Sequence, residues 1–198
     1  MLSHKLQENG IRAVRADGNA DLLIVQTAVE CASRHPITLI GEDTDRLVLL
    51  CMHADTTSFP LLFRSEGHQT SKKMRRIWNI NWLKKQLGPK ICSLLPFVHA
   101  ITGCDTTSRL FGVGKEAALK KLRSNVELKK EAAGFLKQSS KEEVTCLNGG
   151  DYGEGLAVLR YRKFCEKAMR GCSFVQVHTL PPTTAAAQSH SARTYFQC

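Results

Sequence analysis

Hydrophobic positions along the first part of the chain change between strand-like and helix-like spacing. Residues 11–16 (IRAVRA) favour a short strand, and apolar residues between 19 and 34 recur at helical spacing, with Asp17 or Asn19 as the expected N-cap. Residues 37–43 (ITLIGED) are apolar without alternation, which is typical of a parallel strand buried on both faces. The order strand, helix, strand predicts a βαβ unit and therefore a parallel sheet.

The remaining patterns extend this α/β arrangement and then become helical. Strands are predicted at 60–66 and 75–80, and helices at 81–105 (in pieces), 114–138 (as a lysine-rich pair), 156–170 and 180–197. Together these elements predict an α/β fold, a three-layer domain with a mainly parallel sheet, followed by a helical C-terminal part.

Charge adds a preference for an anionic partner. The 198 residues include 28 Lys and Arg against 18 Asp and Glu, a formal net charge of +10. Such a balance favours nucleic acid first and an anionic membrane surface second, and a soluble basic domain without such a partner is the alternative. The sequence has no signal peptide and no apolar run of the ~18 residues that a membrane span needs, so we expect an intracellular protein.

Two smaller observations bear on the compartment. Eight cysteines occur without any C-x-x-C pair, which favours buried thiols in a reducing compartment over a zinc site. The basic run KKMRR (72–76) is a solvated loop, a phosphate contact or a nuclear-localisation patch. We therefore expect a nuclear location and no membrane association.

Acidic residues gather where the strand at 37–43 ends. Asp43 closes this strand, Asp45 follows two residues later, and Asp21 lies in the opening turn of the preceding helix, at the same expected edge of the sheet. Ligands of open parallel sheets bind beyond this edge. Close carboxylates repel one another unless a cation lies between them, and Mg²⁺ or Mn²⁺ is the usual partner of oxygen ligands. The alternative is that Asp43 caps the following helix and its acidic neighbours are solvated.

A glycine turn opens the lysine-rich helices. Asp105 ends the apolar segment HAITGCD, and the sequence GVG follows at 112–114. A turn of this kind presents backbone N–H groups to an anion, helped by the helix dipole. We expect it to hold a nucleic-acid backbone without reading bases, and an ordinary glycine turn is the alternative. The predicted contact residues are Gly112, Gly114, Lys115, Lys120 and Lys121.

These motifs resemble the flap-endonuclease-like (5′-nuclease, PIN-like) superfamily. That family carries an acidic element on a helix, an E-D-x-D element at a strand end, a G-C-D element and a G-[IV]-G hairpin, in this order. The matching segments here are NAD (19–21), EDTD (42–45), GCD (103–105) and GVGKEAA (112–118). HAITGCDTTS together with the LPPT segment is also similar to a divergent, transposon-associated animal branch.

The resemblance implies both an extent and a chemistry. It implies a partial nuclease domain with a helical hairpin over 11–125 and a helical extension over 126–198. It further implies two Mg²⁺ or Mn²⁺ ions that activate water for phosphodiester hydrolysis, with DNA as the expected substrate. By resemblance the metal ligands are Asp21, Asp43, Asp45 and Asp105, and the last three are the expected catalytic residues.

Two departures from the family pattern leave the activity open. Asn19 stands where the family has a glutamate, and the family's first strand, with its own aspartate, has no counterpart here. The first hypothesis is a magnesium-dependent, structure-selective nuclease, or the C-terminal part of one. The second is a catalytically degenerate protein that binds nucleic acid or another partner on the same fold. The third is a fragment without stable activity.

Overall fold

The computed structural model describes most of the chain. The described ranges are 2–55, 59–65, 76–109, 112–136, 155–170 and 174–197. They belong to two compact units, Met1–Pro89 (unit 1) and Lys90–Cys198 (unit 2). Residues 72–75, most of the basic run considered for nuclear localisation, lie outside the described part. Among the described residues, no helix is both long enough and apolar enough to cross a membrane.

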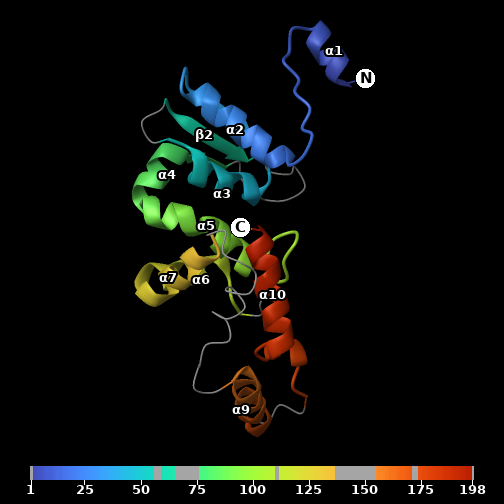
Figure 1. Cartoon of the computed structure of the whole chain (residues 1–198), viewed down its shortest axis with the longest axis vertical. Coiled ribbons are helices and arrows are strands. Elements are labelled where there is room, and N and C mark those ends of the chain that lie inside the picture. The colour runs from blue at the N-terminus through green and yellow to red at the C-terminus, as the bar shows by residue number, and fades with distance from the viewer. Residues whose placement is uncertain are drawn as a thin grey trace. The chain divides into compact units, whose positions relative to one another are not determined.

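Unit 1 contains a small mixed sheet and its covering helices (Figure 1). Its elements are α1 (Leu2–Glu8), α2 (Ala20–Ala32), β1 (Ile37–Ile40), α3 (Thr44–His53), β2 (Leu61–Ser65), β3 (Arg76–Asn79) and α4 (Ile80–Leu87). The strand order is β1-β2-β3, with β1 parallel and β3 antiparallel to β2. In the register, Leu39 lies beside Phe63, which lies beside Trp78.

The core of unit 1 lies on one face of this sheet. Leu61 and Phe63 of β2 pack there with Val25 of α2, Leu50 of α3 and Ile80 of α4, all of them buried. Figure 1 shows α2 and α3 lying over the sheet. The strand positions between these core residues are more open, and Ile40 at the end of β1 is half exposed. The described strands therefore bury mainly one face.

The predicted three-layer domain with a mainly parallel sheet is wrong. The described residues are mostly helical, and their three strands form one parallel and one antiparallel pair. Residues 11–16 form no strand, and their largest apolar side chains, Ile11 and Val14, are exposed rather than packed in a sheet. The parallel pair that does form consists of β1 and β2, which α3 joins. The predicted pair was 11–16 and 37–43, joined by the preceding helix.

Unit 2 is built from helices in its described part. They are α5 (Pro89–Ile101), α6 (Lys115–Ser124), α7 (Val126–Gly134), α9 (Leu156–Met169), the short 3₁₀ helix η1 (Val177–Thr179) and α10 (Thr184–Gln197). The most apolar of them, α5, buries Cys92, Leu94, Phe97 and Ala100 among others, and continues through Pro96. The boundary at 125/126 implied by the resemblance falls between α6 and α7 and stays a prediction.

Candidate functional site: an acidic strand end and a basic helical unit

Two residues of the predicted acidic motifs, Asn19 before α2 and Asp43 after β1, take part in the local folding of unit 1. Asn19 caps α2, its side-chain oxygen accepting a hydrogen bond from the Leu22 N–H at 3.1 Å. Asp43 caps α3 in the same way, with Oδ1 accepting from the Asp45 N–H at 3.0 Å. The cap expected of Asp43 is therefore confirmed, but the acidic neighbours are not all solvated as that alternative expected, since Asp21 is paired with Arg46. An N-cap carboxylate satisfies one of the N–H groups that the first turn of a helix leaves without an intrahelical partner.

Asp21 has a cationic partner within the protein. Arg46 Nε donates to Asp21 Oδ1 at 2.7 Å, and the two side chains are 28% and 33% exposed. This ion pair joins the first turn of α2 to the first turn of α3. Gly41 leaves room for it, since a Cβ there would lie 2.9 Å from Arg46 Nη1. Arg46 was not among the residues predicted from the sequence, although it directly follows the EDTD motif.

These contacts reduce the number of carboxylates in unit 1 that are open to a divalent cation. The oxygen donors are of the kind that Mg²⁺ and Mn²⁺ prefer. However, the guanidinium of Arg46 already neutralises Asp21, and Asp43 is engaged as a cap. Within the described ranges, no three His, Cys, Asp or Glu residues group closely enough to hold a metal ion. Asp21, Asp43 and Asp45 lie at one end of unit 1, whereas Asp105 belongs to unit 2.

Asp105 lies in a tightly bonded turn after α5. The Thr107 hydroxyl donates to the Ala100 carbonyl at 2.6 Å and accepts from the Cys104 N–H at 3.1 Å. Gly103 has φ +101°, and a Cβ there would lie 2.9 Å from the Cα of Arg109, so this position requires glycine. The turn leaves the Asp105 side chain exposed.

The same turn perturbs a thiol. Partial burial raises the pKa of Cys104, but hydrogen bonds with the side chains and backbones of Thr106 and Thr107 outweigh it, so the pKa lies below its ordinary value of 9.0. The Thr106 hydroxyl has a second acceptor in Gln197 Oε1 of α10 at 2.5 Å, and its single proton serves one acceptor at a time. The C-terminal helix of unit 2 is thus bonded directly to this loop.

The glycine turn and α6 form the basic part of the site. Gly112 has φ +74°, and Gly114 caps α6 without a side-chain hydrogen bond. Lys115, Lys120 and Lys121 are exposed on this helix. The five predicted backbone-binding residues thus lie in the turn before α6 and on α6 itself.

Lys115 also has a partner that the sequence analysis did not assign. Its Nζ lies 2.8 Å from Nδ1 of His99, a buried residue of α5. A charged ammonium group can only donate, so Nδ1 of His99 carries the lone pair in this contact. This bond holds the start of α6 against the end of α5.

Comparison with protein-family models, curated proteins and solved structures finds no match for this chain. The assignment to the flap-endonuclease-like superfamily therefore stays a prediction.

Proposed function

We propose that the protein binds nucleic acid through its phosphate backbone, with the G-V-G turn and α6 of unit 2 as the contact. One observation carries this proposal: α6 starts at a glycine cap without a capping side chain and exposes Lys115, Lys120 and Lys121. The N–H groups of such a helix start favour an anion, and lysines add charge without base specificity. Lys90–Cys198 contains sixteen Lys and Arg against nine Asp and Glu, which supports the same partner.

The test is a salt titration of binding. A fluorescein-labelled 20-base-pair DNA duplex would be titrated with the wild type and with Lys120→Ala/Lys121→Ala, by fluorescence anisotropy at several salt concentrations. If each lysine contacts one phosphate, the slope of log K against log[salt] becomes shallower by about 1.8. The affinity at low salt then falls about 10-fold or more.

The control removes the same charge from the neighbouring helix. Lys129→Ala/Lys130→Ala acts on α7, where Lys129 donates to the Arg123 carbonyl and Lys130 pairs with Glu127. We expect the control to keep most of the slope and affinity. Equal losses in both double variants would show that only net charge matters, and absence of binding by the wild type at low salt would refute the proposed function.

A second candidate function is Mg²⁺- or Mn²⁺-dependent phosphodiester hydrolysis. It is favoured by the place of Asp43 and Asp45 directly after β1, by the ion pair that links Asp21 to the start of α3, and by the exposure of Asp105. Thermal unfolding with and without Mn²⁺ would be compared for the wild type and Asp43→Asn, because asparagine keeps the cap and removes the charge. Hydrolysis predicts a cation-dependent rise in melting temperature in the wild type alone, together with cleavage of flap DNA.

The opposite outcome has an equally definite meaning. If both proteins melt at one temperature with or without the cation, and flap DNA stays intact, the carboxylates of unit 1 have structural roles only. Backbone binding by unit 2 would then be the remaining function.

A further inference from the structure

A groove lies between α9 and the start of α10 in unit 2, apart from the G-V-G turn. Its volume is about 550 Å³. Helix α9 supplies one wall, and the segment that leads into α10 supplies the other. The lining residues are Ala157, Arg160, Tyr161, Phe164, Leu180, Thr183, Thr184 and Ala185.

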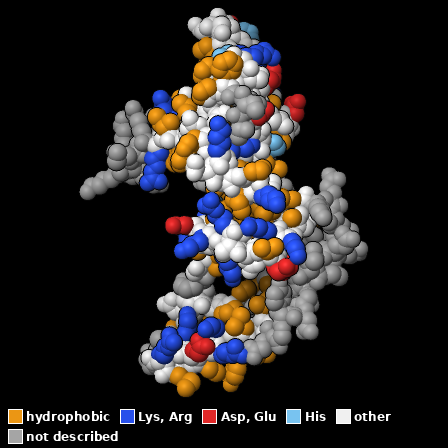
Figure 2. Space-filling view, turned by 90° about the vertical axis from the view of Figure 1, so that its left-hand side faces the viewer, with side chains coloured by type: hydrophobic (Ala, Val, Ile, Leu, Met, Phe, Trp, Pro, Cys, Tyr) orange, Lys and Arg blue, Asp and Glu red, His pale blue; other side chains and the backbone are white. Residues whose placement is uncertain are grey.

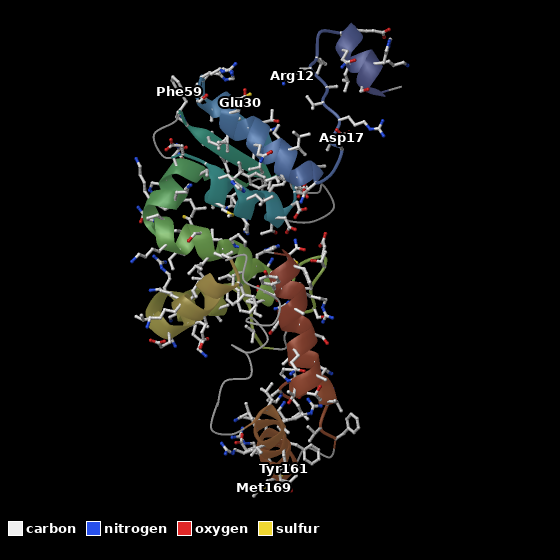
Figure 3. The ribbon with its side chains drawn as sticks, viewed as in Figure 1. Arg12, Asp17, Glu30, Phe59, Tyr161 and Met169 are labelled. Carbon is white, nitrogen blue, oxygen red and sulfur yellow. The ribbon has the colours of Figure 1, made fainter. Side chains whose placement is uncertain are left out.

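Two aromatic side chains that line this groove are exposed to solvent. Tyr161 is 70% and Phe164 is 45% exposed. Figure 3 labels Tyr161 on α9. Ala157, Tyr161 and Phe164 follow one another at spacings of four and three, so they share one face of the helix. In a folded domain, large rings on such a face normally pack against the core, yet α9, which is described throughout, buries none of its residues.

Hydrogen bonds from α9 fix the second wall. The Arg160 guanidinium donates to the Pro181 carbonyl, and Lys167 Nζ donates to the Thr179 carbonyl at 3.3 Å. These two cations hold the segment before α10 against α9. The groove is therefore shaped by two basic side chains of α9.

The net positive charge of α9 favours a negatively charged partner. The helix carries four Lys and Arg residues and one acid, Glu166, which is bonded to Lys163 at 2.8 Å. None of the described lining residues is acidic. Figure 2 shows Lys and Arg side chains beside hydrophobic ones in the lower part of the view, where α9 lies. A second copy of this face would bring like charges together, so an anionic partner fits better.

We propose that this groove binds the bases of single-stranded nucleic acid, a proposal that rests on the proposed nucleic-acid function and assigns it a second surface. The rings of Tyr161 and Phe164 provide the stacking faces, because every base offers a π-face to an aromatic side chain. Arg160 and the N-terminal end of α10 lie beside them and attract the phosphate of the same nucleotide. Duplex DNA keeps its bases stacked on one another, so this groove distinguishes single strands from duplexes.

The test compares one single strand with one duplex. Anisotropy titrations would use fluorescein-labelled dT20 and the 20-base-pair duplex with the wild type, Tyr161→Ala/Phe164→Ala and Tyr161→Trp. Loss of one stacked base lowers affinity about 10-fold, so the double variant should bind dT20 at least 10-fold more weakly and bind the duplex as before. Tyr161→Trp keeps a stacking ring and should bind dT20 at least as tightly as the wild type.

A matched control removes an equally exposed ring elsewhere in the unit. Phe196, near the end of α10, is 72% exposed and does not line the groove. Phe196→Ala should leave both affinities unchanged. Thermal unfolding of each variant confirms that the fold is kept, and Tyr161→Trp provides a second measurement should the double variant unfold.

Each remaining outcome has one meaning. If the double variant binds dT20 as the wild type does, the groove proposal is overturned while backbone binding stands. If the wild type binds neither oligonucleotide, both proposals fail. If the variant loses binding to vesicles of anionic phosphatidylserine but not to dT20, the groove is a lipid contact and the proposal is equally overturned.

Discussion

The two units of the chain differ in how they neutralise charge. Residues 1–89 contain twelve Lys and Arg against nine Asp and Glu, whereas residues 90–198 contain sixteen against nine. In unit 1, the notable acids have partners within the fold, since Arg46 pairs with Asp21 and the α3 N-terminus engages Asp43. Unit 2 carries the larger cationic excess, which is the property expected of a surface that meets an anion.

Packing separates the core of unit 1 from α9 in the same way, while α5 gives unit 2 buried residues of its own. The core residues of unit 1, such as Leu50 and Ile80, have almost no exposed surface, whereas α9 of unit 2 buries none of its residues. A buried, internally neutralised region contributes stability. An exposed, basic and aromatic region contributes little to stability and is free to bind. Asp21 and Asp43, which match a nuclease motif in the sequence, therefore have roles in folding that do not depend on a metal ion.

The largest expected effect is a loss of stability in unit 1. Leu50→Ala should lower the free energy of unfolding by about 2–5 kcal/mol, because it leaves a cavity in the core. Both tryptophans, Trp78 and Trp82, lie in unit 1, so their fluorescence during urea unfolding reports on this unit. The matched change Val158→Ala, at a position of α9 that is 50% exposed, should shift the same transition by less than about 0.5 kcal/mol. Equal shifts would contradict the contrast between the core of unit 1 and α9.

A smaller effect is expected at the ion pair of unit 1. A double-mutant cycle with Asp21→Asn and Arg46→Met should give a coupling energy of about 1 kcal/mol, since both side chains are only partly buried. The coupling should fall as salt is added. The pair Arg34 and Glu30, far more exposed, provides the control and should couple by less than about 0.5 kcal/mol. Coupling at Asp21 no larger than in the control would mean that Arg46 is not its structural partner.

The sequence predicted local structure better than it predicted the sheet. The helix that follows Asn19 depends on neighbouring residues, and it is found in the structure. Strand pairing depends on distant partners instead. Residues 37–43 were expected to be buried on both faces, yet β1 ends at Ile40 and mainly one of its faces is covered. An apolar run alone does not reveal how many layers will cover it.

The candidate site was limited by the same difficulty. The pattern correctly predicted a lysine-rich helix after Gly114, because a helix depends on residues that are neighbours in the chain. It could not reveal that Arg46 reaches Asp21 across 25 residues, or that Lys115 meets His99. Acids that resemble metal ligands in the sequence can instead be caps and ion-pair members, and only the geometry separates these roles.

The smallest expected effect concerns the reactivity of Cys104. Its pKa lies below 9.0 in the folded protein, so peptide-resolved alkylation with iodoacetamide should reach half its maximal rate below pH 9.0. Because folding favours the thiolate, the stability gained from this group is fully present above pH 9.0 and is lost as pH falls through the folded pKa. Thr106→Val removes one hydroxyl donor and should move the alkylation midpoint to higher pH. Gln197→Ala removes only the competing acceptor of that hydroxyl, so the midpoint should stay or move lower. A higher midpoint in Gln197→Ala as well would attribute the shift to loosening of the loop rather than to the hydrogen bond.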